Sequence, residues 1–311
     1  MPACDDGAAM LLMNAPPSIF VSHGSPMIAL EPGAAGFFLA QLGLAIDVAF
    51  GRPRAIVAIS AHALARAPLV RGATRHEAVH DFGGFPAALH ALRYDAPGSP
   101  AVAAEVAGRL ESAGILVHRS DTGGLDHGIW TMLRYIYPQA DVPVVPLALV
   151  PNAPPAQQFA LGTALAPLRS SGVLVLGTGS ITHNLQRLFG GNQGRQPDAD
   201  ATEIRESADF RRWFAERSAA LDWPALFDYR TQAPYAADMH PTDEHLLPWY
   251  VAAGAGGAAV PPLRLHASVT FGSLGMDAYA FGAEAPRLAQ ALSSSQTAAT
   301  TLPSSEGSSR L

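Results

Sequence analysis

Short apolar runs of the kind that form buried strands alternate along this chain with longer segments of helical periodicity, and this alternation most constrains the fold. The expected strands are Ser18–Ser22, Ala55–Ser60, Val142–Leu149, Val173–Gly177 and Leu263–Phe271. The expected helices are about Ala34–Asp47, Ala101–Ala113, Ile129–Tyr135, Ala156–Leu168, Ala201–Ala219 and Glu244–Ala253. Continuous apolar strands that alternate with helices predict an α/β fold, in which helices cover both faces of a central, mixed or mostly parallel sheet.

The chain shows no internal repeat and no shift of composition that would divide it. Its 311 residues are 49% hydrophobic and 15% charged, which is enough for one large core. We expect a flexible leader at residues 1–17, a single catalytic domain at residues 18–290 and a disordered tail at residues 291–311. The tail is rich in serine and threonine and almost without large apolar side chains from Ser293 onward, and the polar segment Gly190–Asp200 is expected to form a loop.

Composition excludes several classes of function. The chain contains no lysine, so Schiff-base chemistry and a P-loop are impossible, and Cys4 is its single cysteine, which excludes iron–sulfur clusters, thiolate zinc sites and internal disulfides. Any metal must therefore be bound by histidine or carboxylate. A net charge of −6 with scattered arginines argues against nucleic acid as a partner. The sequence contains no run of eighteen apolar residues, so we expect no membrane span. The cysteine usage is consistent with a cytoplasmic location.

Four histidines end apolar runs or lie in turns rich in glycine, serine and proline: His23 in FVSHGSP, His62 in VAISAH, His183 in LGTGSITHN and His240 in MHPTDEH. In open α/β sheets, sites form beyond the carboxyl ends of the strands. A single histidine in such a place is most often structural, but His23 and His62 follow two strands at matched positions and should reach the same edge. Imidazoles that converge usually bind a metal ion. Glu244 and His245, further along the last segment, can equally be ordinary helix-start residues.

Three other residues are candidates for contact with a substrate. His127, in GLDHGIW, precedes a helix and could bind an anionic or phenolic group. His80 lies in the aromatic, glycine-rich segment VHDFGGFP, which suits the lining of a pocket for a ring. Ser25 lies in the turn that follows His23. The remaining histidines lack comparable context and are treated as structural.

Seven segments in one order resemble the DODA-type extradiol aromatic ring-opening dioxygenases, which belong to the LigB superfamily of class III extradiol enzymes. The segments are FVSHGSPMIALE, AISAH, VHDFGGFP followed by YDAPGSP, GLDHGIWTML, THNL, HPTDEHLLPWYVAAGA and FGSLGMDAYAFG. The resemblance runs from about Ser18 to Gly282, and seven motifs in register make it highly specific. One departure is Ala63, where the family usually has an aromatic residue after the second metal histidine, so the pocket is expected to differ there.

The resemblance implies a LigB-like fold and roles for five histidines. His23, His62 and His240 would bind the metal, His127 would contact the substrate, and His183 would be the acid/base, although in some members its counterpart is assigned to the metal. The implied reaction opens the ring of a catechol next to its diol and incorporates both atoms of O2. The substrate would be a small aromatic diol, DOPA-like or related.

Three protein ligands that leave coordination positions open suit non-haem Fe(II), whereas three neutral imidazoles suit zinc as well. We therefore expect one divalent metal ion, Zn²⁺ in the protein as isolated and Fe²⁺ in the catalytic form. The assembly expected is a monomer or a small homo-oligomer.

Two alternatives remain open from the sequence. The first is a zinc-dependent hydrolase, in which bound water attacks an ester or amide, although the chain lacks an H-E-x-x-H motif. The second is a non-catalytic interaction protein on the same fold. The particular catechol and the position of cleavage depend on pocket shape and are not fixed by these motifs.

Overall fold

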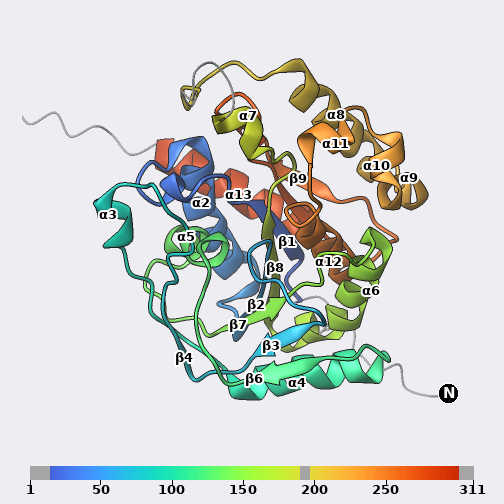
Figure 1. Cartoon of the computed structure of the whole chain (residues 1–311). Coiled ribbons are helices and arrows are strands. Elements are labelled where there is room, and N and C mark those ends of the chain that lie inside the picture. The colour runs from blue at the N-terminus through green and yellow to red at the C-terminus, as the bar shows by residue number, and fades with distance from the viewer. Residues whose placement is uncertain (1–14, 190–196, 301–311) are drawn as a thin grey trace, which may run out of the picture.

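A computed structural model describes residues 15–189 and 197–300 of the chain. Its centre is an eight-stranded sheet, which Figure 1 shows between two layers of helices. The strands lie in the order β6 (His118–Ser120), β3 (Leu69–Arg71), β7 (Val144–Ala148), β2 (Ala55–Ser60), β8 (Val173–Gly179), β1 (Ser18–Ser22), β12 (Ala278–Phe281) and β9 (Leu263–His266). Two small sheets lie outside it: β4 (Arg75–His76) with β5 (Ala96–Pro97), and β10 (Val269–Thr270) with β11 (Leu274–Gly275).

The carboxyl ends of β1, β2 and β8 meet at one edge of this sheet. β8 lies between the other two and is parallel to both, and its Thr178 pairs with Val21 on one side and Ser60 on the other. β7 is parallel to β2, whereas β3, β12 and β9 each run antiparallel to a neighbour. The expected mixed, mostly parallel sheet is confirmed. Segments that follow β1, β2 and β8 are therefore neighbours, although they are far apart in the sequence.

Helices cover both faces of the sheet, as predicted. One face carries α2 (Gly33–Phe50), α5 (His127–Ile136) and α13 (Ala285–Thr300), and the other α4 (Pro100–Ser112), α6 (Pro155–Leu165), α8 (Arg205–Ala219) and α12 (Leu247–Gly256). Alternation along β2 feeds both cores: Val57 and Ile59 pack with α6 and α12, whereas Ile56 and Ala58 pack with α2 and α5. Every residue of β2 is buried, which explains its continuous apolar sequence.

The remaining elements are short: η1 (Pro26–Ala29), α3 (Ala87–His90), η2 (Ala166–Ser171), α7 (Leu185–Phe189), α9 (Trp223–Phe227), α10 (Tyr229–Gln232) and α11 (Ala236–Met239). The expected strand Leu263–Phe271 is divided between β9 and β10, and the expected helix from Glu244 begins only at Leu247. The tail expectation is partly corrected, because α13 continues to Thr300. Buried Leu288 and Leu292 anchor that helix in the core. Residues 1–14, 190–196 and 301–311 of the expected leader, loop and tail lie outside the described residues.

Helix α2 is the one helix among residues 15–189 and 197–300 that is long and apolar enough to cross a membrane, with a mean hydropathy of 1.6 over 18 residues. Half of that window is buried inside the protein. Its buried side chains, among them Leu39, Leu42 and Ile46, recur at helical spacing and pack against α5 and α13. Burial accounts for the apolar residues of this face, whereas Phe37, Leu44 and Val48 of the same helix are exposed.

Candidate active site

A cavity of about 330 Å³ opens at the edge where β1, β2 and β8 end. Its polar lining includes the imidazoles of His62, His127, His183 and His245 and the carboxylate of Asp81. Its apolar lining includes Phe82, Phe85, Leu185, Leu188 and Leu274. A lining that combines aromatic side chains with a few polar groups suits a small planar ligand that carries polar groups.

Three imidazoles, those of His23, His62 and His245, form what we call the histidine cluster. One nitrogen atom from each of the three rings lies within 4.8 Å of those of the other two. The Nε2 atoms of His23 and His62 are 3.1 Å apart. His23 follows β1 directly, His62 follows β2, and His245 lies in the turn before α12. The edge of the sheet therefore brings together side chains that are up to 222 positions apart in the sequence, from His23 to His245.

The Nδ1 atoms of two cluster members, His23 and His245, form hydrogen bonds with other side chains. Nδ1 of His23 lies 2.9 Å from Oγ1 of Thr178, and Nδ1 of His245 lies 3.1 Å from Oε1 of Glu244. Within the part of the chain that the structure describes, no group hydrogen-bonds the buried Nε2 of His245. A buried nitrogen without a partner is costly, and a cation bound among the three imidazoles would satisfy it. The residues present therefore fit a metal ion.

Burial sets the protonation of these rings. It lowers the pKa of His62 to about 4 and that of His183 to about 3. The pKa values of His23 and His245 are lowered well below the usual value, first by burial and then by the neighbouring imidazoles. All four rings are consequently neutral at pH 7, and a neutral imidazole has the lone pair that a metal ligand needs.

His245 reaches the cluster because β8 ends in a glycine. A Cβ atom on Gly179 would lie 2.1 Å from the carbonyl oxygen of His245, so a larger residue cannot occupy this position without displacing the turn. The backbone N–H of Ser180 donates to the same carbonyl oxygen at 2.8 Å. This close approach of the turn to β8 fixes the backbone that carries His245.

Among the described residues, the group that includes His23 and His62 contains His245 and not His240. Nε2 of His240 donates to the carbonyl oxygen of Ile181 at 2.7 Å, and its ring lies near those of Phe210 and Tyr229. His245, five residues later in the same HPTDEH segment, lies beside His23 and His62 instead. The sequence favours a helix-start role for His245, but α12 begins only at Leu247, so His245 lies in the turn before the helix.

His127 lies where it was expected, at the start of α5 and on the cavity wall. Oδ1 of Asp81 accepts from both its backbone N–H at 3.0 Å and its Nδ1 at 2.9 Å. Burial alone would raise the pKa of Asp81, but these hydrogen bonds outweigh it and lower the pKa. The carboxylate thereby orients the ring of His127 and leaves its Nε2 for other partners. Sequence reasoning does not identify Asp81, although it lies in the VHDFGGFP segment directly after His80.

His183 also lines the cavity, and its ring stacks on that of His245 with centroids 3.4 Å apart and an interplanar angle of 8°. Its backbone N–H donates to the carbonyl oxygen of Met239 at 2.9 Å, which ties the loop after β8 to α11. His183 therefore lies next to the histidine cluster rather than within it.

The two expected substrate contacts have different outcomes. His80 is absent from the cavity wall, and its Nε2 lies 3.1 Å from the carbonyl oxygen of Leu92. Phe82 and Phe85, from the same segment, line the cavity in its place, and the ring of Phe82 meets His127 edge-on with centroids 5.6 Å apart. Ser25 does line the cavity, and its Oγ accepts from the backbone N–H of Met27 at 3.3 Å.

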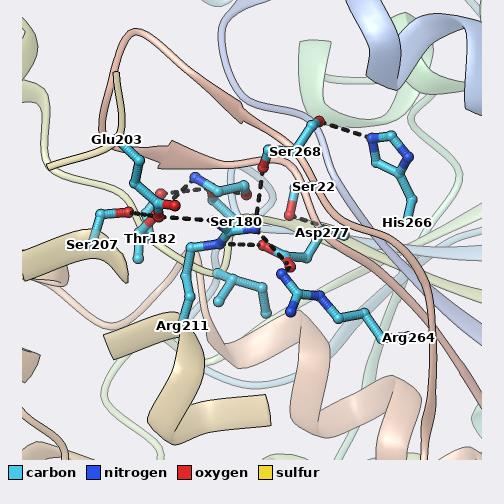
Figure 2. A network of polar contacts seen from close by, with 12 residues as sticks. Ser22, Ser180, Thr182, Glu203, Ser207, Arg211, Arg264, His266, Ser268 and Asp277 are labelled. Carbon is cyan, nitrogen blue, oxygen red and sulfur yellow. Dashed lines mark hydrogen bonds and ion pairs between the residues drawn. The ribbon is translucent and has the colours of Figure 1, made fainter. Parts of the chain in front are cut away.

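A buried polar network supports the segment before His23 (Figure 2). Both the backbone N–H and the hydroxyl of Ser22 donate to the carbonyl oxygen of Asp277, at 3.0 and 2.9 Å. The carboxylate of Asp277 accepts two hydrogen bonds from Arg211 of α8, at 2.8 and 3.1 Å, and it also contacts Arg264 of β9. This network joins β1, β9 and α8 to the residue that directly precedes β12.

Comparison with known proteins agrees with this geometry. The family model described as the catalytic LigB subunit of aromatic ring-opening dioxygenase matches residues 17–282. A 4,5-DOPA dioxygenase extradiol of Beta vulgaris is 33% identical over 269 residues, covering 86% of this chain and 97% of the relative. The protein of the same name from Escherichia coli K12 is 32% identical, with 84% and 92% covered. A crystal structure of an uncharacterized protein from Escherichia coli K12 superposes with a TM-score of 0.69 at 28% identity and covers 86% of this chain and all of that chain.

Proposed function

The chain belongs to the LigB family of aromatic ring-opening dioxygenases, and from this premise we propose that it opens the ring of a catechol, DOPA-like or related, next to its diol with incorporation of both atoms of O2. The observation that carries the proposal is the histidine cluster beside an aromatic-walled cavity. Three neutral imidazoles, of which those of His62 and His245 line a space large enough for one ring, match what the reaction requires.

We assign His23, His62 and His245 as ligands of one divalent metal ion, with iron as the catalytic metal and zinc as the metal expected in the isolated protein. When bound, iron supplies the one-electron chemistry that O2 needs, which zinc lacks. The assignment of His245 in place of His240 rests on position, because a nitrogen of His245 lies within 4.8 Å of nitrogens of His23 and His62. His240 instead donates its Nε2 hydrogen to the carbonyl oxygen of Ile181.

The other cavity residues bind the substrate and move its proton. His127, oriented by Asp81 through Nδ1, would present Nε2 to a phenolic oxygen. The neutral ring of His183 would accept a phenolic proton, because an ionised catechol oxygen beside it favours the imidazolium form. Phe82 and Phe85 would pack on the aromatic ring and exclude water from it.

Oxygen consumption tests the activity directly. Metal-free protein reconstituted anaerobically with Fe(II) is mixed with a panel of catechols in an oxygen electrode, and the ring-opened product is followed by its yellow colour and by ¹⁸O incorporation. We expect uptake of one O2 per catechol with the iron form and little with the zinc form. Equal rates from fully zinc-loaded protein, or no uptake with any catechol, would contradict the proposal.

A pair of variants tests the metal assignment. His245→Ala should lower bound zinc from one equivalent towards none, whereas His240→Ala should leave it near one, because His240 bonds Ile181 instead of facing the cluster. The reverse result would restore His240 as the ligand. His183→Ala should abolish turnover while metal content stays near that of the wild type, and loss of metal in this variant would make His183 a ligand.

A further inference from the structure

The hydroxyl of Thr178 lies between the segment that carries His23 and the segment that carries His127. Thr178 is the second-last residue of β8 and is fully buried. Its Oγ1 lies 2.9 Å from Nδ1 of His23 and 2.8 Å from the carbonyl oxygen of Gly128, in the first turn of α5. One side-chain oxygen thus bridges a proposed metal ligand and the helix turn of a proposed substrate contact.

The chemistry of these three groups fixes where the protons lie. A carbonyl oxygen can only accept, so the single hydroxyl hydrogen of Thr178 points to Gly128. Oγ1 is then left as an acceptor towards His23, which requires the hydrogen of that neutral imidazole to be on Nδ1. The lone pair is consequently on Nε2, the atom that faces His62 at 3.1 Å.

Close packing leaves Nδ1 of His23 little choice of partner. A Cβ atom on Gly128 would lie 2.6 Å from Oγ of Ser60 and 3.0 Å from Nδ1 of His23, so the absence of a side chain there lets the helix turn reach both. The nearby carboxylate of Asp126 accepts from Ser60 at 2.5 Å. Among the described residues, Oγ1 of Thr178 is the hydrogen-bond partner of Nδ1 of His23, at 2.9 Å.

We infer that Thr178 is a positioning residue, which holds His23 in the tautomer that offers Nε2 to the metal and fixes its ring relative to the first turn of α5. The inference rests on the proposed function, since it takes His23 as a metal ligand. His245 and His127 have carboxylate partners for the same purpose, Glu244 and Asp81. His23 has an uncharged partner, Thr178, which adds no further negative charge to the site. Thr178 also links His23 to the first turn of α5, which carries His127. Partners of ligating histidines typically contribute about 10–100-fold to metal affinity.

The test compares Thr178→Val, which keeps the shape but removes the hydroxyl, with Thr178→Ser, which keeps the hydroxyl. The zinc dissociation constant of each metal-free protein is measured by competition with a chromophoric chelator at pH 7.5. We expect Thr178→Val to weaken zinc binding by about 10–100-fold and Thr178→Ser to stay within about threefold of the wild type. Thr131→Val is a matched control, because Thr131 is a buried hydroxyl that donates to a carbonyl oxygen, that of His127 at 2.6 Å, without an imidazole partner.

Zinc affinity within about threefold of the wild type in Thr178→Val, or a loss in Thr178→Ser as large as in Thr178→Val, would overturn the inference. The thermal midpoint of each metal-free protein verifies folding, and Thr178→Ala takes the place of Thr178→Val if the latter fails to fold. A second measurement, catechol binding to zinc-saturated protein by calorimetry, should weaken in Thr178→Val, and unchanged binding would overturn the coupling to α5. Zinc affinity is measured without turnover, so it tests the role of Thr178 separately from the enzymatic activity. Failure of the oxygen-uptake assay would contradict the proposed function and would not change the measured zinc affinities.

Discussion

At the scale of single residues, the site depends on a position that has no side chain. Gly179 has no side chain, and this allows the turn that carries His245 to lie directly against β8. We predict that Gly179→Ala displaces this turn, because the added Cβ would lie 2.1 Å from the carbonyl oxygen of His245 and a backbone atom cannot rotate away. Overpacking of this kind costs about 1–3 kcal/mol of the free energy of unfolding, measured by denaturant titration. Zinc affinity should fall in the same variant.

Gly108 provides the matched control. It lies inside α4, and a Cβ atom added there would meet no other atom within 4 Å. Gly108→Ala should therefore raise the free energy of unfolding by about 0.5–1 kcal/mol through helix propensity and leave zinc affinity unchanged. Wild-type stability and zinc affinity in Gly179→Ala would show that the turn is not fixed by this contact.

At the scale of elements, the network of Figure 2 joins strands and a helix through one buried carboxylate. Asp277 is completely buried and Arg211 nearly so, and their two hydrogen bonds tie β12 to α8. We predict that Asp277→Asn destabilises the protein by about 3–5 kcal/mol, because it removes the more buried of the two carboxylates that pair with the guanidinium of Arg211, the other being that of Glu203. Arg205→Ala, which removes an exposed pair with Asp209 on α8, should leave the unfolding midpoint unchanged. Equal effects of the two substitutions would contradict the prediction.

Elements that are buried on both faces were predictable from the sequence, and elements defined by contacts with distant segments were not. The bounds expected for Ser18–Ser22 and Ala55–Ser60 agree with β1 and β2, because every residue of both strands is buried and apolarity alone marks them. β6 (His118–Ser120) is a short strand beside β3 with exposed or half-buried side chains, and its HRS sequence carries no such signal.

The choice between His240 and His245 shows the same limit within the site. The HPTDEH segment indicates a turn with two histidines, but which ring enters the cavity depends on how that turn approaches β8. This approach depends on Gly179 and Ser180, more than sixty positions earlier in the chain. The histidines that directly follow strands, His23 and His62, needed no such information, because the ends of parallel neighbouring strands meet at one edge.

At the scale of the whole molecule, burial of several neutral imidazoles links folding to pH. Burial lowers the pKa of His62 and of His240 to about 4 and that of His183 to about 3, whereas an imidazole in the unfolded chain titrates near 6.5. Between these pH values the unfolded chain binds more protons than the folded chain, so the free energy of unfolding rises with pH. The contribution of these histidines is complete above about pH 6.5 and is lost as the pH falls towards 4.

We therefore predict that metal-free protein loses stability steeply between pH 6.5 and pH 4. Each histidine of this kind adds a slope of up to about 1.4 kcal/mol per pH unit, so denaturant titrations at pH 7.5, 6.0 and 5.0 should show falling midpoints. Saturating zinc should raise the midpoint at pH 7.5, because zinc binds only the folded cluster, and should raise it less at pH 5.0, where protons compete for the imidazoles. A midpoint that stays constant from pH 7.5 to 5.0 in the metal-free protein would contradict this prediction, because it would mean that folding leaves the pKa values of these imidazoles unshifted.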